Sequence, residues 1–315
     1  MLRITYENKL GKLQLGGGRD THIWRILEAD GLGLTAKQFN TVTYPTEIGQ
    51  HTMSETINAR TITLKCDIRS PKGAQFEIAR ALRILNRPGT LTIHSGITKR
   101  KINARCAAAE QGERHGGYRV FVMQFLCDYP YFEDTCHTNV PIFRRENLIG
   151  SGRRWYFDET AAFHSQPIST NQFILPCMFS RRTSSANVMN LGDVDTEPVL
   201  QIYIQGNLFP EAGRKIRITN NATNQTIEMN LDAYIADEAE KERDITKDEI
   251  TLNIPERTVY NIYGENLISI LSNDSFLSAF WLECGNNIIE VENSVSARCA
   301  VMCEFSNKYI EAVLS

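Results

Sequence analysis

Alternation of apolar and polar residues predicts β-strands along most of this chain. In residues 59–68 nearly every second position is apolar, which gives a strand one buried and one solvent-facing side. Residues 199–205 alternate in the same way, after a proline that suits the start of a strand. Two further arms, residues 215–219 and 226–231, flank a polar turn at 220–224 and predict a hairpin. The chain is therefore expected to be mainly β, with two β-sandwich-type domains.

One segment departs from this two-residue period and predicts a helix. Ser70 is a favourable N-cap, and Pro71 fits the first helical position. Apolar residues then repeat at helical spacing, and Pro88 prevents the helix from continuing. The apolar stripe consists of Ile78, Ala81, Leu82 and Leu85. The first domain should thus contain one α-helix, over residues 71–86.

Residues 118–127, with the sequence YRVFVMQFLC, are apolar on both faces of the strand that they predict. Such a strand needs cover on both sides, either inside the sandwich or against a neighbouring subunit. A first domain with one helix can cover one face well, so the other face is the candidate subunit interface. That face carries Val120, Val122 and Gln124.

The length of 315 residues exceeds the roughly 250–300 residues that one hydrophobic core usually serves, so two domains are expected. Periodicity weakens in residues 136–183, where glycines, prolines and paired arginines interrupt it. The predicted organisation is an N-terminal β domain over residues 1–135, a linker or extension over 136–183, and a C-terminal β-sandwich over 184–315.

Composition narrows the classes of function. The net charge is −3, whereas a protein whose main work is to grip nucleic acid needs clustered Lys and Arg. No apolar run reaches the ~18 residues that suggest a membrane span, so no membrane insertion is expected. Residues 1–7 indicate the start of a strand, not a signal segment. The eight cysteines form no C-x-x-C pair, which favours free thiols and a cytosolic origin.

No motif points to catalysis. The glycines at 16–18 are followed by Arg19 and Asp20, not by the Lys-Ser/Thr of a phosphate loop. The six histidines lack metal-ligand spacing, and residues 193–197 lack the glycine and distant glutamate of a calcium loop. We therefore expect no catalytic residue, no cofactor and no bound metal. A site assembled across the fold, such as the two carboxylates of a glycosidase, stays open as an alternative.

Four local patterns together resemble the distal tail protein family of long-tailed, siphovirus-type phages. Two of them fall in the first domain and two in the second, so the likeness spans most of the chain. They are residues 48–51 with 59–64, residues 127–132, residues 190–193 with 197–199, and residues 284–289. Residues 136–183 depart from the family pattern, because they are longer than the simplest members need.

The resemblance implies that the first domain closes a ring, usually of six copies, and that the second domain is galectin-like and projects outward. The ring would join the tail tube protein to a tail-tip hub or tail-associated protein, with docking points for a receptor-binding protein. Its place would be the tail tip of the virion, after assembly in the host cytoplasm. Sequence-specific binding of nucleic acid is not implied.

Two other functions compete with the adaptor ring. The first is a monomeric carbohydrate-binding β-sandwich used as an adhesin, since residues 155–157 and Trp281 carry aromatic rings that can stack on sugars. Aromatic residues of a β-sandwich are more often part of the core. The second, more remote, is a tail-associated wall hydrolase.

Overall fold

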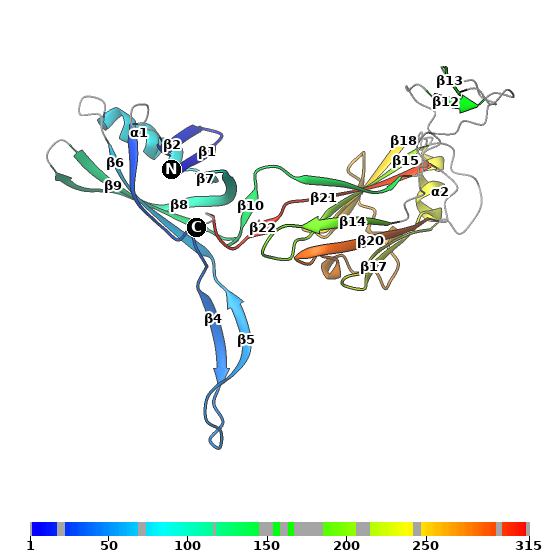
Figure 1. The fold of residues 1–315 in the computed structure, drawn as a ribbon, viewed down its shortest axis with the longest axis horizontal. Helices are drawn as coiled ribbons and strands as arrows, with labels where there is room; N and C mark the ends of the chain where they lie inside the picture. The colour runs from blue at the N-terminus through cyan, green and yellow to red at the C-terminus, as the bar shows by residue number, and fades with distance from the viewer. Residues whose placement is uncertain are drawn as a thin grey trace. The chain divides into compact units, whose positions relative to one another are not determined.

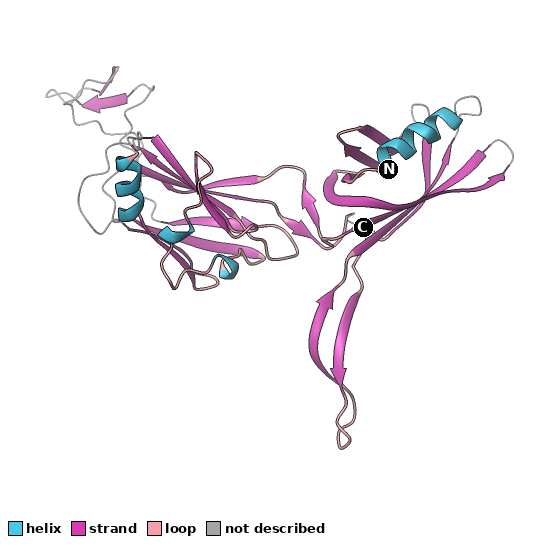
Figure 2. Ribbon diagram, turned by 180° about the vertical axis from the view of Figure 1, so that it is seen from behind, coloured by secondary structure: helices cyan, strands magenta, loops and turns pink. Residues whose placement is uncertain are grey.

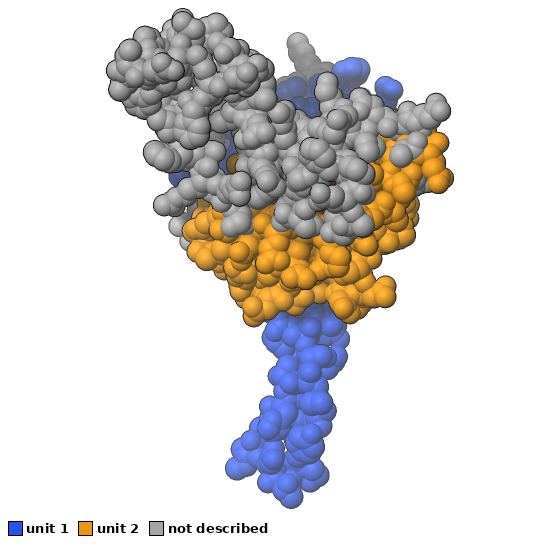
Figure 3. All heavy atoms as spheres, turned by 90° about the vertical axis from the view of Figure 1, so that its right-hand side faces the viewer, with its two compact units in different colours: residues 1–136, 307–315 blue, residues 137–306 orange. Residues whose placement is uncertain are grey.

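The computed structural model divides the chain into two compact units, which are described one at a time. Unit 1 comprises residues 1–136 and 307–315, and unit 2 comprises residues 137–306 (Figure 3). The residues that the structure describes are 2–17, 23–68, 74–115, 118–144, 154–157, 163–166, 185–205, 215–241, 247–293 and 298–312. In this part of the chain no helix is long and apolar enough to cross a membrane.

Unit 1 is built on a sheet of nine strands with one helix (Figure 1). Its strand order is β2-β1-β7-β8-β9-β6-β3, and short β10 pairs with both β8 and β22. The elements are β1 (Arg3–Asn8), β2 (Gly11–Gly16), β3 (Trp24–Asp30), β6 (Arg60–Ile68), α1 (Ala74–Leu85), β7 (Gly89–Ser95), β8 (Thr98–His115), β9 (Tyr118–Cys127), β10 (Phe132–Asp134) and β22 (Lys308–Tyr309). A hairpin of β4 (Lys37–Val42) and β5 (His51–Ile57) completes the unit.

Strand β8 joins the two halves of this sheet. Its first part pairs with β7, and its second part pairs with β9. The alternation predicted in β6 is confirmed, because Ile62, Leu64, Cys66 and Ile68 are all buried. They form one core with the inward side chains of β9 and with α1, which packs against β2 and β8 (Figure 2).

The helix is confirmed, with a different buried stripe. It covers Ala74–Leu85, and the predicted cap at Ser70 and Pro71 lies outside the described residues. Ile78, Ala81 and Leu85 are buried as expected, but Leu82 is exposed and Ile84 is buried in its place. Leu82 lies at one edge of the predicted stripe and Ile84 lies beyond the opposite edge, so the angle at which the helix crosses the sheet decides between them.

Unit 2 is a sandwich of two antiparallel sheets. One has the order β11-β21-β15-β18-β19 and the other β14-β20-β16-β17. The elements are β11 (Thr138–Arg144), β12 (Arg154–Phe157), β13 (Phe163–Gln166), β14 (Ser185–Asn190), β15 (Val199–Gln205), β16 (Lys215–Asn220), β17 (Gln225–Asn230), α2 (Asp232–Glu240), β18 (Lys247–Asn253), β19 (Thr258–Asn261), η1 (Ile268–Ile270), η2 (Leu277–Ala279), β20 (Gly285–Asn293) and β21 (Arg298–Phe305).

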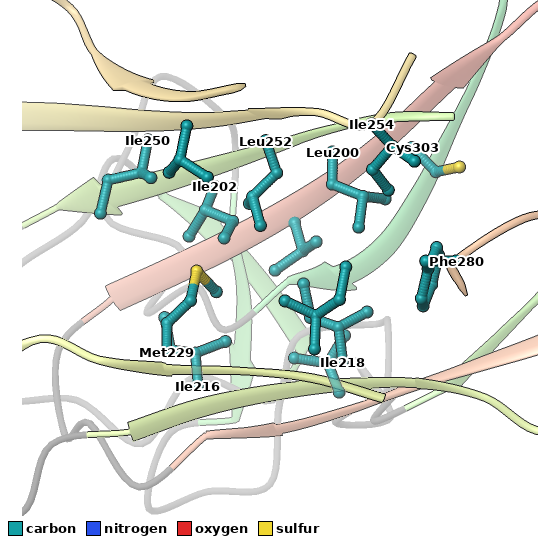
Figure 4. Close-up of a cluster of buried hydrophobic side chains, with 14 of the residues drawn as sticks. Leu200, Ile202, Ile216, Ile218, Met229, Ile250, Leu252, Ile254, Phe280 and Cys303 are labelled. Atoms are coloured by element: carbon teal, nitrogen blue, oxygen red, sulfur yellow. The ribbon is translucent and has the colours of Figure 1, made fainter. Parts of the chain in front are cut away.

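Side chains from both sheets fill the core of unit 2 (Figure 4). Leu200 and Ile202 of β15 face Ile216 and Ile218 of β16 across the sandwich, and all four are at most 1% exposed. The alternation that predicted β15 and the hairpin β16–β17 therefore placed the right residues inside. The mainly β class, with a helix in the first unit, is confirmed.

The unit boundaries differ from the predicted domains at two places. Residues 137–144, assigned to a linker, belong to unit 2, because β11 pairs with β21. The last residues, 307–315, assigned to the second domain, belong to unit 1, because β22 pairs with β10. Unit 2 is thus an insertion in unit 1, connected to it at both ends. Most of the remaining predicted linker, residues 145–183, lies outside the described residues.

Among the described residues, six cysteines carry free thiols, and they differ in burial. Cys66, Cys127 and Cys303 are buried, whereas Cys136 and Cys284 are exposed. Burial raises the pKa of the Cys66 thiol to about 12 and that of the Cys127 thiol to about 11. The pKa of the Cys284 thiol is raised by partial burial and then by the carboxylate of Asp195.

Alkylation of the native chain at neutral pH should follow this order. Only the thiolate reacts, so Cys136 should be modified first and Cys284 more slowly. The buried Cys66 and Cys127 should react only as the chain unfolds. Their raised pKa also contributes stability that is present below the unfolded value of about 8.5 and is lost as pH rises through the folded values. Mass spectrometry of peptides checks the order, and early modification of Cys66 would contradict it.

Candidate assembly surface

The hairpin β4–β5 is the most exposed part of unit 1. Every residue from 36 to 59 is exposed, and no third strand pairs with either β4 or β5 among the described residues. Figure 1 shows the two strands leaving the sheet as an arm, and Figure 3 shows the arm with no other part of unit 1 around it. A two-stranded hairpin alone is marginally stable in water. Its two open edges are also templates for pairing with another chain.

Large apolar side chains line this arm without cover. Phe39 is 52% exposed and Met53 is 66% exposed, and Ile48 at the tip is fully exposed. Ile57 lies directly opposite Lys37, two residues from Phe39, so Phe39 and Ile57 share a face of the hairpin. Lys37 and Glu55 lie on the same face. Exposed large apolar side chains on an unpaired hairpin favour a site that contacts another protein.

Polar pairs hold the two strands in register. The Nζ atom of Lys37 lies 2.5 Å from a carboxylate oxygen of Glu55, and Asn40 donates a hydrogen bond to Ser54 at 2.9 Å. At the tip, Glu47 contacts the ring of His51 at 2.5 Å. These pairs are exposed and each adds little stability.

The base of the arm is held more firmly than its strands. Gly31 precedes the arm with φ of +82°, and a Cβ atom there would lie 2.1 Å from the carbonyl oxygen of Thr61. Only glycine fits such a position. The carbonyl oxygens of Gly31 and Gly33 both accept hydrogen bonds from the guanidinium of Arg60, at 2.7 and 2.5 Å. The arm therefore projects from a rigid base.

The local sequence pattern does not predict this arm. Residues 35–44 give no definite element and residues 48–52 indicate a turn, whereas β5 begins at His51. The available signal was two segments of mixed polar and apolar residues on either side of Pro45 and Gly49. Nothing in that pattern shows that both faces are exposed.

Strand β9 presents its two faces differently. Phe121, Met123 and Phe125 point inward and are fully buried, and the ring of Phe121 packs edge-on against Trp24 at a centroid distance of 5.4 Å. On the other face, Val120 and Val122 are half-buried and Gln124 is exposed. The unit thus covers one face completely and the other in part.

The three predicted interface residues lie together on the outer face of β9, where apolar side chains alternate with charged neighbours on β6 and β8. Val122 lies between Lys65 of β6 and Glu110 of β8. Val120 lies opposite Asp67, whose Oδ1 atom is buried and has no hydrogen-bond partner among the described residues. A buried acceptor without a donor is uncommon in folded proteins and calls for an explanation.

The described residues offer no group of three or more His, Cys, Asp or Glu side chains arranged to hold a metal ion. The pKa of Tyr203, on the outer face of β15, is raised by partial burial and by Glu249 and Glu304. Its hydroxyl donates to Gln201 at 2.9 Å. The hydrogen bond to Gln201 satisfies the Tyr203 hydroxyl. These contacts do not activate Tyr203 as a nucleophile or a base.

Comparison with known proteins shows a similarity of fold. No protein-family model matches the chain, and no curated protein matches its sequence. Among solved structures, the Dit protein of phage SPP1, described as a paradigm of the hub adsorption apparatus in phages that infect Gram-positive hosts, matches with a TM-score of 0.62 and 12% identity. The match covers 98% of this chain and 99% of SPP1 Dit.

A second match is to a chain of the phage P2 baseplate in its activated conformation, with a TM-score of 0.47, 12% identity, and coverage of 96% and 97% of the two chains. At this score the likeness carries no argument. The match to SPP1 Dit does carry one, because it includes both units. The resemblance to distal tail proteins is thus confirmed at the level of the fold, and this chain shares the fold of SPP1 Dit over nearly its whole length.

Proposed function

We propose that this chain is a structural subunit of a phage tail tip, where copies of it assemble into a ring. The observation that carries the proposal is the β4–β5 arm, an exposed apolar hairpin on a rigid base. The fold shared with SPP1 Dit supports a tail-tip role. An arm that contacts a different surface of the next copy makes a head-to-tail interface, and such interfaces close into rings when the rotation allows it.

The outer face of β9 is the surface that we propose for the neighbouring copy. It combines half-buried Val120 and Val122 with the Oδ1 atom of Asp67, which is buried and has no hydrogen-bond partner among the described residues. A donor from a second copy would satisfy this oxygen. The sheet face and the arm are distinct surfaces of the same unit, as a head-to-tail contact requires.

The ring would be a hexamer that joins the tail tube protein to a tail-tip hub or tail-associated protein, in the virion, after assembly in the host cytoplasm. A receptor-binding protein would dock on unit 2. These partners follow from the family resemblance and the shared fold. A non-enzymatic role agrees with the same likeness.

The test removes the apolar face of the arm. A Phe39→Ser, Ile57→Ser double variant should keep the unfolding transition of the wild type, because both side chains are exposed. Its association should weaken by about tenfold or more, since each buried large side chain contributes roughly 1.5–3 kcal/mol. Mass photometry and light scattering over a range of concentrations measure the assembly.

Ile97→Ser is the matched control, because Ile97 is fully exposed at the turn between β7 and β8 and lies off the arm. It should assemble like the wild type. A double variant that assembles as well as the control would exclude the arm from the interface. A wild-type chain that stays monomeric at high concentration, even beside its tube partner, would overturn the adaptor ring. Glycan binding by such a monomer would then favour an adhesin.

A further inference from the structure

The C-terminal segment of residues 307–312, here called the strap, is an integral part of unit 1. The backbone N–H of Ala312 donates to the carbonyl oxygen of Leu32 at 2.8 Å, and Ala312 is fully buried. Asn307 and Tyr309 both donate to the same carboxylate oxygen of Asp134, at 2.8 and 3.2 Å. The strap therefore lies against the segment from which the arm begins.

Arg60 connects the strap and the base of the arm through one side chain. Arg60 is 2% exposed, and its guanidinium donates to four backbone carbonyl oxygens. Two acceptors, Gly31 and Gly33, lie at the base of the arm, and a third, Pro130, follows β9. The fourth is Ile310 of the strap, 2.6 Å from Nη2. The guanidinium also stacks on the ring of Phe132 at 4.5 Å.

The four hydrogen bonds depend on one another, because a single buried guanidinium donates all of them. A buried cation is costly unless all of its donors are matched, and here the four acceptors are neutral backbone carbonyl groups. Burial lowers the pKa of Arg60, as expected for a charge held away from water. If the strap detaches from unit 1, Arg60 loses the carbonyl oxygen of Ile310 as an acceptor. Its guanidinium would then be stabilised by turning toward water. The two glycine carbonyls would then lose their donor.

We propose that Arg60 couples the strap to the arm, so that the strap and the base of the arm loosen together. The strap follows Ser306, the last residue of unit 2, by a single peptide bond. A partner that binds unit 2 and pulls on this connection would thereby release the arm. Such coupling is reciprocal, so a neighbouring copy that binds the arm would also stabilise the strap against opening. This consequence for assembly rests on the proposed function of the arm.

Arg100 allows a test that does not touch the arm. It is 6% exposed, donates to the carbonyl oxygen of Glu311 and lies 3.7 Å above the ring of Tyr309. Both contacts are with the strap, and neither reaches residues 31–36. An Arg100→Met change therefore weakens the strap first. It can reach residues 31–36 only through the strap's own contacts there, which are the bonds of Arg60 and the bond from Ala312 to Leu32.

Hydrogen exchange of the full-length chain, followed by mass spectrometry, measures both segments. In Arg100→Met, we expect exchange about tenfold faster in the strap and a clear acceleration in residues 28–36 as well. Residues 89–95 of β7 should be unchanged. Arg60→Lys, which keeps the charge but loses the planar fork, should accelerate both segments. Arg105→Met is the control, since Arg105 is exposed and contacts Asp128 instead.

Faster exchange in the strap with an unchanged base of the arm in Arg100→Met would overturn the coupling. The measurement is made at a concentration where the chain is monomeric, so it does not depend on the ring. If the Phe39→Ser, Ile57→Ser variant assembles normally while Arg100→Met loosens both segments, the coupling stands and the assembly role of the arm fails. Arg60→Lys decides which contact carries the coupling. Normal exchange in residues 28–36 of that variant would leave only the direct bond from Ala312 to Leu32 and would overturn the role of Arg60.

Discussion

Replacement of Phe121 by alanine is expected to lower the free energy of unfolding of unit 1 by about 3–5 kcal/mol. The side chain is fully buried in the core and packs edge-on against Trp24, so its loss leaves a cavity between the sheet and its cover. The melting temperature of this unit should fall by about 10 °C. Calorimetry, with the transition of unit 2 as an internal reference, measures the change.

Val122→Ala serves as the control for this prediction. Val122 follows Phe121 directly and points to the half-buried outer face. Its truncation should cost the isolated chain about 1 kcal/mol or less. A similar loss of stability in both variants would show that the two faces of β9 are equally part of the monomer core.

Val122→Asp is expected to leave the chain folded and to abolish assembly. In the isolated unit the new carboxylate lies on an incompletely covered face between Lys65 and Glu110. Lys65 offsets the repulsion from Glu110, and water can solvate the charge. In a ring that covers this face, the charge would be buried, which costs several kcal/mol unless it is paired. The association constant should therefore fall by about a hundredfold or more.

Mass photometry and the thermal transition together decide this prediction. Ile97→Asp adds the same charge at a fully exposed turn and should assemble like the wild type. A Val122→Asp chain that unfolds would place Val122 in the core of the monomer. A variant that is folded and still assembles would exclude the outer face of β9 from the interface.

Residues whose environment depends on their own strand were predicted correctly. The alternation in β6 identified its four buried apolar side chains, and the alternation in β15 and β16 identified the core of unit 2. A strand places successive side chains on opposite faces, so the choice of the buried face follows from which set is apolar. The apolar residues on both faces of β9 predicted cover on both sides, and unit 1 buries one face fully and the valines of the other face in part.

Helix α1 shows where this local reasoning ends. Its existence follows from apolar residues at helical spacing, but Leu82 at one edge of the stripe and Ile84 beyond the other edge are both apolar. Only the direction in which the helix crosses the sheet buries Ile84 and exposes Leu82. That direction depends on packing between distant segments, which the period of the helix does not contain.

Arg60 and the strap show the same limit at long range. In the sequence, Arg60 is a charged residue at the start of a strand, and charged residues are rarely buried without partners. The structure surrounds it with carbonyl groups from residues 31, 33, 130 and 310. Asp134 and Tyr309 are 175 positions apart, and no local pattern predicts that β10 and β22 pair.

The sequence by itself therefore determined the class of the fold, the existence of its main strands and its helix, and the family that it resembles. These follow from residue periodicity and turn chemistry, which act over a few neighbouring positions. Only the tertiary structure decided that the last residues return to unit 1, that Arg60 is buried, and that residues 36–59 leave the sheet as an uncovered arm. Each of these depends on which distant segments pack together, and an exposed hairpin and a covered one can have the same local pattern.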